Sequence, residues 1–164
     1  MIGIGCAGRT LKSMAHSIAE FAASLAGFEA GYLLWEHEAL ERAGKIVEEE
    51  AKRVIGTYDY GWPQLADQTQ DQRARAGFSE NEPLLRTGEL RDSIEHTVVE
   101  HDHACYVGSN SKIAVYQELG TSRIPPRSFI GGASRVKEHE VHEELRRSLY
   151  LRFLGLLGIG ALAR

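Results

Sequence analysis

The sequence has 164 residues, the length of one domain, and a formal net charge of −4 from 19 Lys and Arg against 23 Asp and Glu. Its 43% apolar and 26% charged residues are typical of a soluble globular chain. Acids and bases are interleaved, so no broad basic surface indicates nucleic-acid binding. Charged residues interrupt the apolar N-terminal stretches, so we expect no secretion signal. No window approaches the roughly 20 apolar residues that cross a bilayer, so we expect no membrane contact.

The first predicted element is a helical region over residues 10–55. In its second half, apolar residues recur every three, four or seven positions and form one stripe: Leu33, Leu40, Ala43, Val47, Ala51 and Val54. Three i,i+4 pairs support the charged side at about 0.2–0.5 kcal/mol each: Glu41–Lys45, Glu48–Lys52 and Glu49–Arg53. An interruption at Gly27 or Gly31 stays open, and Gly56 is expected to end the helix.

Residues 57–83 are predicted to form a long loop. Gly61-Trp62-Pro63 indicates a turn with an aromatic anchor, and the polar run after it is either a short helix or a mobile segment. A loop of this length in a compact domain is usually functional or disordered.

The stretch LLRTGELRDSI, residues 84–94, breaks one pattern and starts another. Thr87 is expected to cap the helix that begins there, a contribution of about 1 kcal/mol. Gly88 either admits a close backbone or relieves the turn, and Glu89 suits the helix dipole. The single glycine before Glu89 does not fit a phosphate loop. We therefore interpret Thr87 and Gly88 as a structural hinge.

Two strands are predicted next, over residues 94–100 and 103–108, joined by the polar turn His-Asp-His into a β-hairpin. Residues 110–120 return to helical spacing, with Ile113, Tyr116 and Leu119 on one side. Gly120 is expected to end this helix. We therefore count Gly120 as a third hinge residue beside Thr87 and Gly88.

The C-terminal part is predicted to begin with an extended segment, because Pro125 and Pro126 block a helix. Residues 133–153 then form a helix with one apolar side directed inward: Val136, Val141, Leu145, Leu149 and Phe153. The apolar tail, residues 154–164, is expected to pack on a neighbouring surface. The chain is thus predicted to be a single α+β domain over residues 1–164, with a small antiparallel sheet packed with a long N-terminal helix and a C-terminal helix.

Histidines raise the alternative of a metal-dependent enzyme. His101 and His103 alternate along a strand, and His139 and His142 stand one helical turn apart. No third ligand has a fixed spacing to either pair, and a polar turn and a solvated helix face explain both pairs equally well. There is no GxSxG sequence, and Cys6 and Cys105 lack metal-binding spacing. We therefore expect no catalytic residue, cofactor or metal site.

The order of these motifs resembles the minor virion proteins of long-tailed bacteriophages and prophages known as tail-completion, neck or virion-morphogenesis proteins. That family has a Leu-x-x-Thr-Gly-x-Leu-x-x-Ser-Ile block, a Val-Gly-Ser strand end, a short helix ending Glu-x-Gly-Thr, and a Pro-x-Arg-Pro-Phe-like segment. The corresponding residues here are 84–94, 107–109, 116–121 and 125–130, preceded by the Gly61-Trp62-Pro63-x-Leu65 run. Ser128 replaces the frequent proline, and Val115-Tyr116 replaces the usual Tyr-Ala order, so the subfamily stays open. The resemblance covers about residues 57–153 and takes in the core at 84–153.

The resemblance implies a non-enzymatic adaptor that forms a ring of six copies at the head–tail junction of a virion, assembled in the host bacterial cytoplasm. Its partners would be further copies of itself, portal or head-completion connector proteins, and tail terminator or tail tube proteins. DNA would pass through the lumen without specific binding, which suits a chain without clustered Lys and Arg. Alternatives are a minor capsid or connector protein at another tier, or a toxin- or regulator-like binding module.

The segment GTSRIPPRSFI is the expected interface of this ring. Pro125 and Pro126 stiffen it and lower the entropy lost on binding. Arg123 and Arg127 can bind a partner carboxylate or backbone, and Phe129 offers apolar contact area, as does Trp62 in the preceding loop. The alternative is that Phe129 and Ile130 are buried in the subunit's own core.

Overall fold

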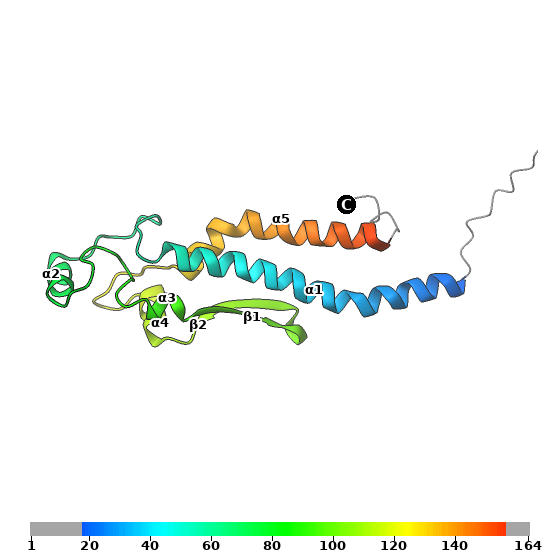
Figure 1. The fold of residues 1–164 in the computed structure, drawn as a ribbon, viewed down its shortest axis with the longest axis horizontal. Coiled ribbons are helices and arrows are strands. Elements are labelled where there is room, and N and C mark those ends of the chain that lie inside the picture. The colour runs from blue at the N-terminus through cyan, green and yellow to red at the C-terminus, as the bar shows by residue number, and fades with distance from the viewer. Residues whose placement is uncertain (1–17, 157–164) are drawn as a thin grey trace, which may run out of the picture.

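In the computed structural model of the protein, the described residues run from 18 to 156, and they form three layers (Figure 1). The long helix α1 lies in the middle, the helix α5 packs on one side of it, and a two-stranded antiparallel sheet packs on the other. The predicted α+β class is confirmed. The element bounds are α1 Ile18–Val54, α2 Asp67–Arg75, α3 Glu89–Asp92, β1 Ile94–Val99, the 3-10 turn η1 Glu100–Asp102, β2 Ala104–Ser109, α4 Lys112–Leu119 and α5 Ile130–Leu156.

Helix α1 runs without interruption through Gly27 and Gly31 and ends two residues before Gly56, whose φ of +92° only glycine adopts easily. The predicted stripe is buried from Ala43 to Val54. Leu33 was expected in that stripe and is 61% exposed, which corrects the prediction. Toward its N-terminus, α1 extends past the turn of the hairpin (Figure 1). Residues 10–17 of the predicted helical region lie outside the described residues.

The hydrophobic core lies at the C-terminal half of α1, where all three layers meet. Its members come from α1, the loop after it, α3, β1, α4, the segment before α5 and the start of α5: Val47, Ala51, Val54, Ile55, Trp62, Leu90, Ile94, Ala114, Phe129 and Ala133. Between residues 31 and 46 of α1, the buried apolar side chains are the small ones of Ala39 and Ala43. In this part of the molecule, polar contacts join α1 to both of its neighbours: Trp35 bonds to Ser148 of α5, and Glu36 bonds to His103 of the hairpin turn.

The predicted hairpin is confirmed, with Ile94 opposite Ser109 and Val99 opposite Ala104. It is attached to α1 through His96, whose Nε2 lies 2.9 Å from a Glu41 carboxylate oxygen and whose Nδ1 contacts Glu48. Gly44 permits this approach, because a Cβ there would lie 2.3 Å from the sulfur of Cys105. The absence of a side chain at Gly44 therefore allows the hairpin to pack closely against α1.

Helix α5 confirms the predicted C-terminal helix but turns a different side to α1. Val136, Leu149 and Phe153 were expected inside and are exposed, while Val141 and Leu145 are half-buried. The contact with α1 is instead partly polar: Trp35 donates to the Ser148 carbonyl at 2.9 Å. Arg42 also donates to Glu144 at 2.6 Å. These bonds rotate α5 so that part of its apolar side faces solvent, and residues 157–164 of the predicted tail lie outside the described residues.

Candidate functional site

A groove of about 830 Å³ is lined by residues of α2, α3 and α4. These three elements lie toward one end of the molecule (Figure 1). One wall is α2 with the loop after it, and the second is the 84–90 block. The remaining walls are α4 and the arm, our name for residues 121–129 between α4 and α5. Five residues that the sequence singled out line this one groove: Thr87, Gly88, Arg123, Pro125 and Arg127. The fold therefore brings the hinge and part of the expected interface together.

The hinge differs in detail from the prediction. Gly88, not Thr87, is the N-cap residue of α3, with φ +91° and ψ −16°, and no side chain caps the helix. The Thr87 hydroxyl lies 3.4 Å from the Glu89 backbone nitrogen, longer than a good hydrogen bond. The left-handed conformation of Gly88 makes the turn, so the helix starts one residue later than a Thr87 cap would place it.

Gly120 ends α4 as predicted, with φ +75°. Its position also requires the absence of a side chain, because a Cβ would lie 2.9 Å from both the Ile124 carbonyl oxygen and the Pro126 nitrogen. The chain folds back here, and Thr121 donates its backbone N–H to Ile124 at 2.8 Å. Gly120 thus fixes the direction in which the arm leaves α4.

The arm is exposed only in part. Arg123, Pro125 and Pro126 face solvent. Arg127 was expected to be free for a partner but is 5% exposed. Its guanidinium donates to the Pro63 carbonyl at 3.1 Å, and its backbone N–H donates to Gln117 at 2.7 Å. Its buried Nε has no hydrogen-bond partner among the described residues.

The two aromatic residues of the expected interface lie inside the molecule. Phe129 is fully buried in the core, which agrees with the alternative interpretation of the sequence. Trp62 is also buried, edge-on to the ring of Tyr60 with the ring centres 5.5 Å apart. Of the six expected interface residues, only Arg123, Pro125 and Pro126 therefore have exposed side chains.

Glu118 is a key residue that the sequence analysis missed. Its carboxylate accepts hydrogen bonds from the backbone nitrogens of Phe129, Ile130 and Gly131 at 2.8, 3.0 and 2.9 Å, and from the Ser128 hydroxyl at 2.6 Å. These are the free N–H groups of the first turn of α5, where a negative charge also suits the helix dipole. Sequence spacing identifies caps that come from the helix's own flank, whereas this cap comes from α4.

Helix α4 exposes most of its apolar residues. The residue turned to the core is Ala114, and the larger side chains face solvent. We call these four the α4 surface: Ile113, Val115, Tyr116 and Leu119, of which Leu119 is 74% exposed. Ile113 also lines the groove, so apolar surface continues from α4 into it.

A second exposed apolar group lies where the N-terminal part of α1 meets the C-terminal part of α5. We call this group the end surface, although Leu151 lies on the opposite side of α5 from Leu149 and Phe153: Leu33, Leu34, Leu149, Leu151 and Phe153. The pairing of Trp35 with Ser148 places these stretches of the two helices side by side. The α4 surface and the end surface are at opposite ends of the molecule (Figure 1).

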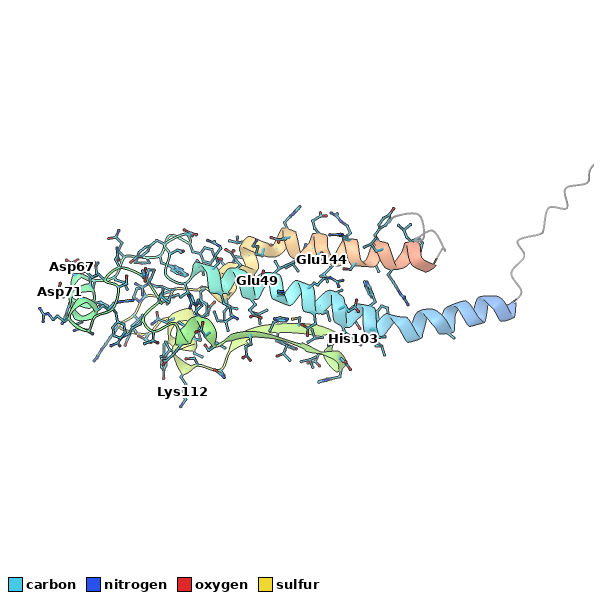
Figure 2. All side chains as sticks on the ribbon, in the orientation of Figure 1. Glu49, Asp67, Asp71, His103, Lys112 and Glu144 are labelled. Atoms are coloured by element: carbon cyan, nitrogen blue, oxygen red, sulfur yellow. The ribbon has the colours of Figure 1, made fainter. Side chains whose placement is uncertain are left out.

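The four histidines of the metal hypothesis are not brought together. His101 and His103 lie at the hairpin turn, where His103 bonds to Glu36 at 2.9 Å. His139 and His142 lie on α5, on the other side of α1 (Figure 2). Within the described part of the chain, no group of three or more His, Cys, Asp or Glu side chains is arranged to hold a metal.

The lining of the groove is basic although the whole chain is acidic. It contains four arginines, Arg73, Arg86, Arg123 and Arg127, and one acidic residue, Glu89. Arg73 donates to the Ser79 carbonyl at 2.8 Å, and Arg86 stacks 4.7 Å above the centre of the Phe78 ring. Arg123 has no side-chain partner among the described residues. Such a lining suits an occupant that carries both a carboxylate and an apolar group.

Comparisons with protein-family models, with curated proteins and with solved structures found no match to the chain. None of the helices within residues 18–156 is long and apolar enough to cross a membrane. The described part of the molecule thus presents a basic groove and two separate groups of exposed apolar side chains.

Proposed function

We propose that the protein is a structural subunit of a tailed phage or prophage virion and acts as a head–tail neck or tail-completion adaptor in a ring around the DNA channel. The main support is the convergence of motif residues on one groove. Three of the four sequence blocks that carry the resemblance to that family contribute to its lining: the 84–94 block with Thr87 and Gly88, the 116–121 block with Gln117, and the 125–130 block with Pro125 and Arg127.

The distribution of apolar surface also supports an assembly role. Large apolar patches on a soluble subunit mark places where other proteins bind. In a ring, one face of each subunit contacts a different face of the next, so a subunit needs at least two binding surfaces. The α4 surface and the end surface lie at opposite ends of the molecule and meet this requirement (Figure 1).

In this proposal the subunit assembles in the host cytoplasm and resides at the head–tail junction. By family analogy the ring has six copies, with portal-side connector proteins above it and tail terminator or tail tube proteins below. DNA passes through the lumen without being bound, because a chain with a net charge of −4 has no excess of cations to contact the phosphates.

Particles made without this protein test the proposal. We expect filled heads and separate tails in electron micrographs, and restored virions when the gene is supplied again. Complete, infectious virions without the protein would refute it. In complete particles, density for the subunit inside the capsid shell, away from the neck, would place it at another tier. If the purified protein binds duplex DNA at low salt, the proposal that the lumen does not bind DNA is wrong.

A further inference from the structure

We propose that the turn of the β-hairpin of one copy docks in the arginine-lined groove of a second copy, and that this contact joins neighbours in the ring. The inference deepens the proposed function, on which it rests. It assigns the groove to a protein segment with acidic and aromatic side chains.

The groove provides a free cation. Arg123 lines it with an exposed guanidinium that has no side-chain partner among the described residues. Arg127 lines the same groove from the same arm, but it is only 5% exposed and its guanidinium already donates to the Pro63 carbonyl. Arg127 therefore adds positive charge to the lining, and Arg123 is the group that can bind a carboxylate directly.

The hairpin provides the complementary charge. Residues 94–109 contain three acids, Glu95, Glu100 and Asp102, and no Lys or Arg. Glu100 and Asp102 are exposed on the turn. Tyr106 beside them is 57% exposed and donates its hydroxyl to Asp102 at 3.2 Å. An exposed aromatic ring next to carboxylates has the composition of an interface anchor.

The contact must form between copies. The hairpin turn, marked by His103, and the helix α4 beside the groove, marked by Lys112, lie at opposite ends of the hairpin (Figure 2). Each strand has six residues, which at about 3.3 Å per residue is about 20 Å. A turn that packs against α1 at one end cannot reach a groove at the other end of the same subunit. Turn-to-groove contacts are heterologous, so they can close into a ring.

The bonds already made by the arginines favour protein over DNA as the occupant. Three of the four are partly engaged within the subunit: Arg73 with Ser79, Arg86 with Phe78, and Arg127 with Pro63. The walls also contain apolar side chains such as Leu84, Ile113 and Ile124. A phosphate backbone calls for several free, exposed cations, whereas a carboxylate with a tyrosine ring fits a groove that is part apolar.

Charge exchange between full-length chains provides the test. We expect Arg123→Glu and Asp102→Arg each to weaken self-association of the purified protein by about tenfold or more, measured by sedimentation over a concentration series. An equimolar mixture of the two variants should associate like the wild type, because each variant groove then meets an oppositely charged turn. Arg135→Glu, an exposed charge reversal on α5 outside the groove, is the matched control and should associate normally. Thermal unfolding of all variants checks that they are folded.

Each outcome decides the proposal. Normal association of Arg123→Glu, a mixture that associates no better than its components, or a wild type that stays monomeric at every concentration would overturn it. Duplex DNA binding that Arg123→Glu abolishes would assign the groove to phosphate instead. The proposed function is separable: particles that are complete without the protein refute that function while the turn-to-groove contact stands. Variants that associate normally although particles need the protein refute only the contact.

Discussion

At the scale of single residues, Glu118 gives the Glu-x-Gly-Thr motif a structural role. Its carboxylate receives three backbone N–H groups at the start of α5 and the hydroxyl of Ser128. The Glu-x-Gly-Thr sequence therefore joins two helices: Glu118 caps α5, and Gly120 turns the chain so that α5 can be reached. This gives a physical reason for both residues without any catalytic role.

We predict that Glu118→Ala lowers the free energy of unfolding by about 2–3 kcal/mol, because several N–H groups lose a charged acceptor. Urea unfolding of the variant and the wild type measures the difference. Glu138→Ala, which removes an exposed carboxylate from α5, is the control and should change stability by no more than about 0.5 kcal/mol. A Glu118 variant as stable as this control would contradict the capping role.

His96 makes hairpin attachment dependent on pH. Its hydrogen bond with Glu48, aided by Glu41, raises the pKa of His96 above 6.5 despite partial burial. Burial acts to raise the pKa of Glu48, but hydrogen bonds from Lys52 and His96 outweigh it and lower that pKa below 4.5. The raised histidine pKa stabilises the fold fully below 6.5 and loses this effect as pH rises through the folded value. The lowered glutamate pKa stabilises the fold above 4.5 and loses this effect as pH falls.

We therefore predict that the His96–Glu48 pair stabilises the protein most between pH 4.5 and 6.5. Urea unfolding over a pH series should show stability falling as pH rises above that window. His96→Gln should flatten this fall, whereas His103→Gln, at an exposed site on the hairpin turn, should keep it. An unchanged slope in His96→Gln would show that another group is responsible.

At the scale of elements, α4 and α5 show that the spacing of apolar residues predicts a helix but not which side of it is buried. The spacing of apolar residues in α4 predicts a helix correctly, but the side turned to the core is the one with Ala114, and Tyr116 and Leu119 are exposed. In α5, Val136 and Leu149 are likewise exposed because polar bonds from Trp35 and Arg42 set its rotation on α1. An apolar stripe on a helix predicts that this side is buried. It does not tell whether the same chain or another molecule buries it.

We predict that replacing Tyr116 and Leu119 together with Ser changes the free energy of unfolding by less than about 1 kcal/mol, since both side chains are already exposed. In particles carrying the double variant, joining of heads to tails should fail because the α4 surface is lost. Infectious yield and unfolding curves measure the two effects. The contrasting change Phe129→Ala should destabilise the fold by about 3–5 kcal/mol. Normal yield from a stable double variant would separate the α4 surface from assembly.

At the scale of the whole molecule, a small core lies toward one end and a pair of helices extends toward the other (Figure 1). The two arm arginines belong to different parts of this design. Arg127 is buried and donates a hydrogen bond to the loop at Pro63, whereas Arg123 has an exposed charge. Only Arg123 can therefore be replaced with little expected effect on the stability of the fold.

We predict that Arg127→Ala lowers the thermal unfolding temperature, because it removes the bond to Pro63 and leaves a buried gap. Arg123→Ala should unfold like the wild type yet reduce head-to-tail joining in particles. Thermal unfolding together with plaque yield separates the two. Equal stability of both variants would mean that the burial of Arg127 contributes nothing to the fold.

The amino-acid sequence by itself determined the local structure: the long helix up to Gly56, the hairpin, the helix before Gly120, the extended arm and the last helix. Each follows from periodicity, glycine or proline, which act over a few residues. Only the tertiary structure decided that Phe129 and Trp62 are internal, that Glu118 caps α5, and that Thr87, Arg123 and Arg127 share one groove. Those facts depend on contacts between residues far apart in the chain, and the rotation of each helix depends on its packing partner, which no short-range pattern specifies.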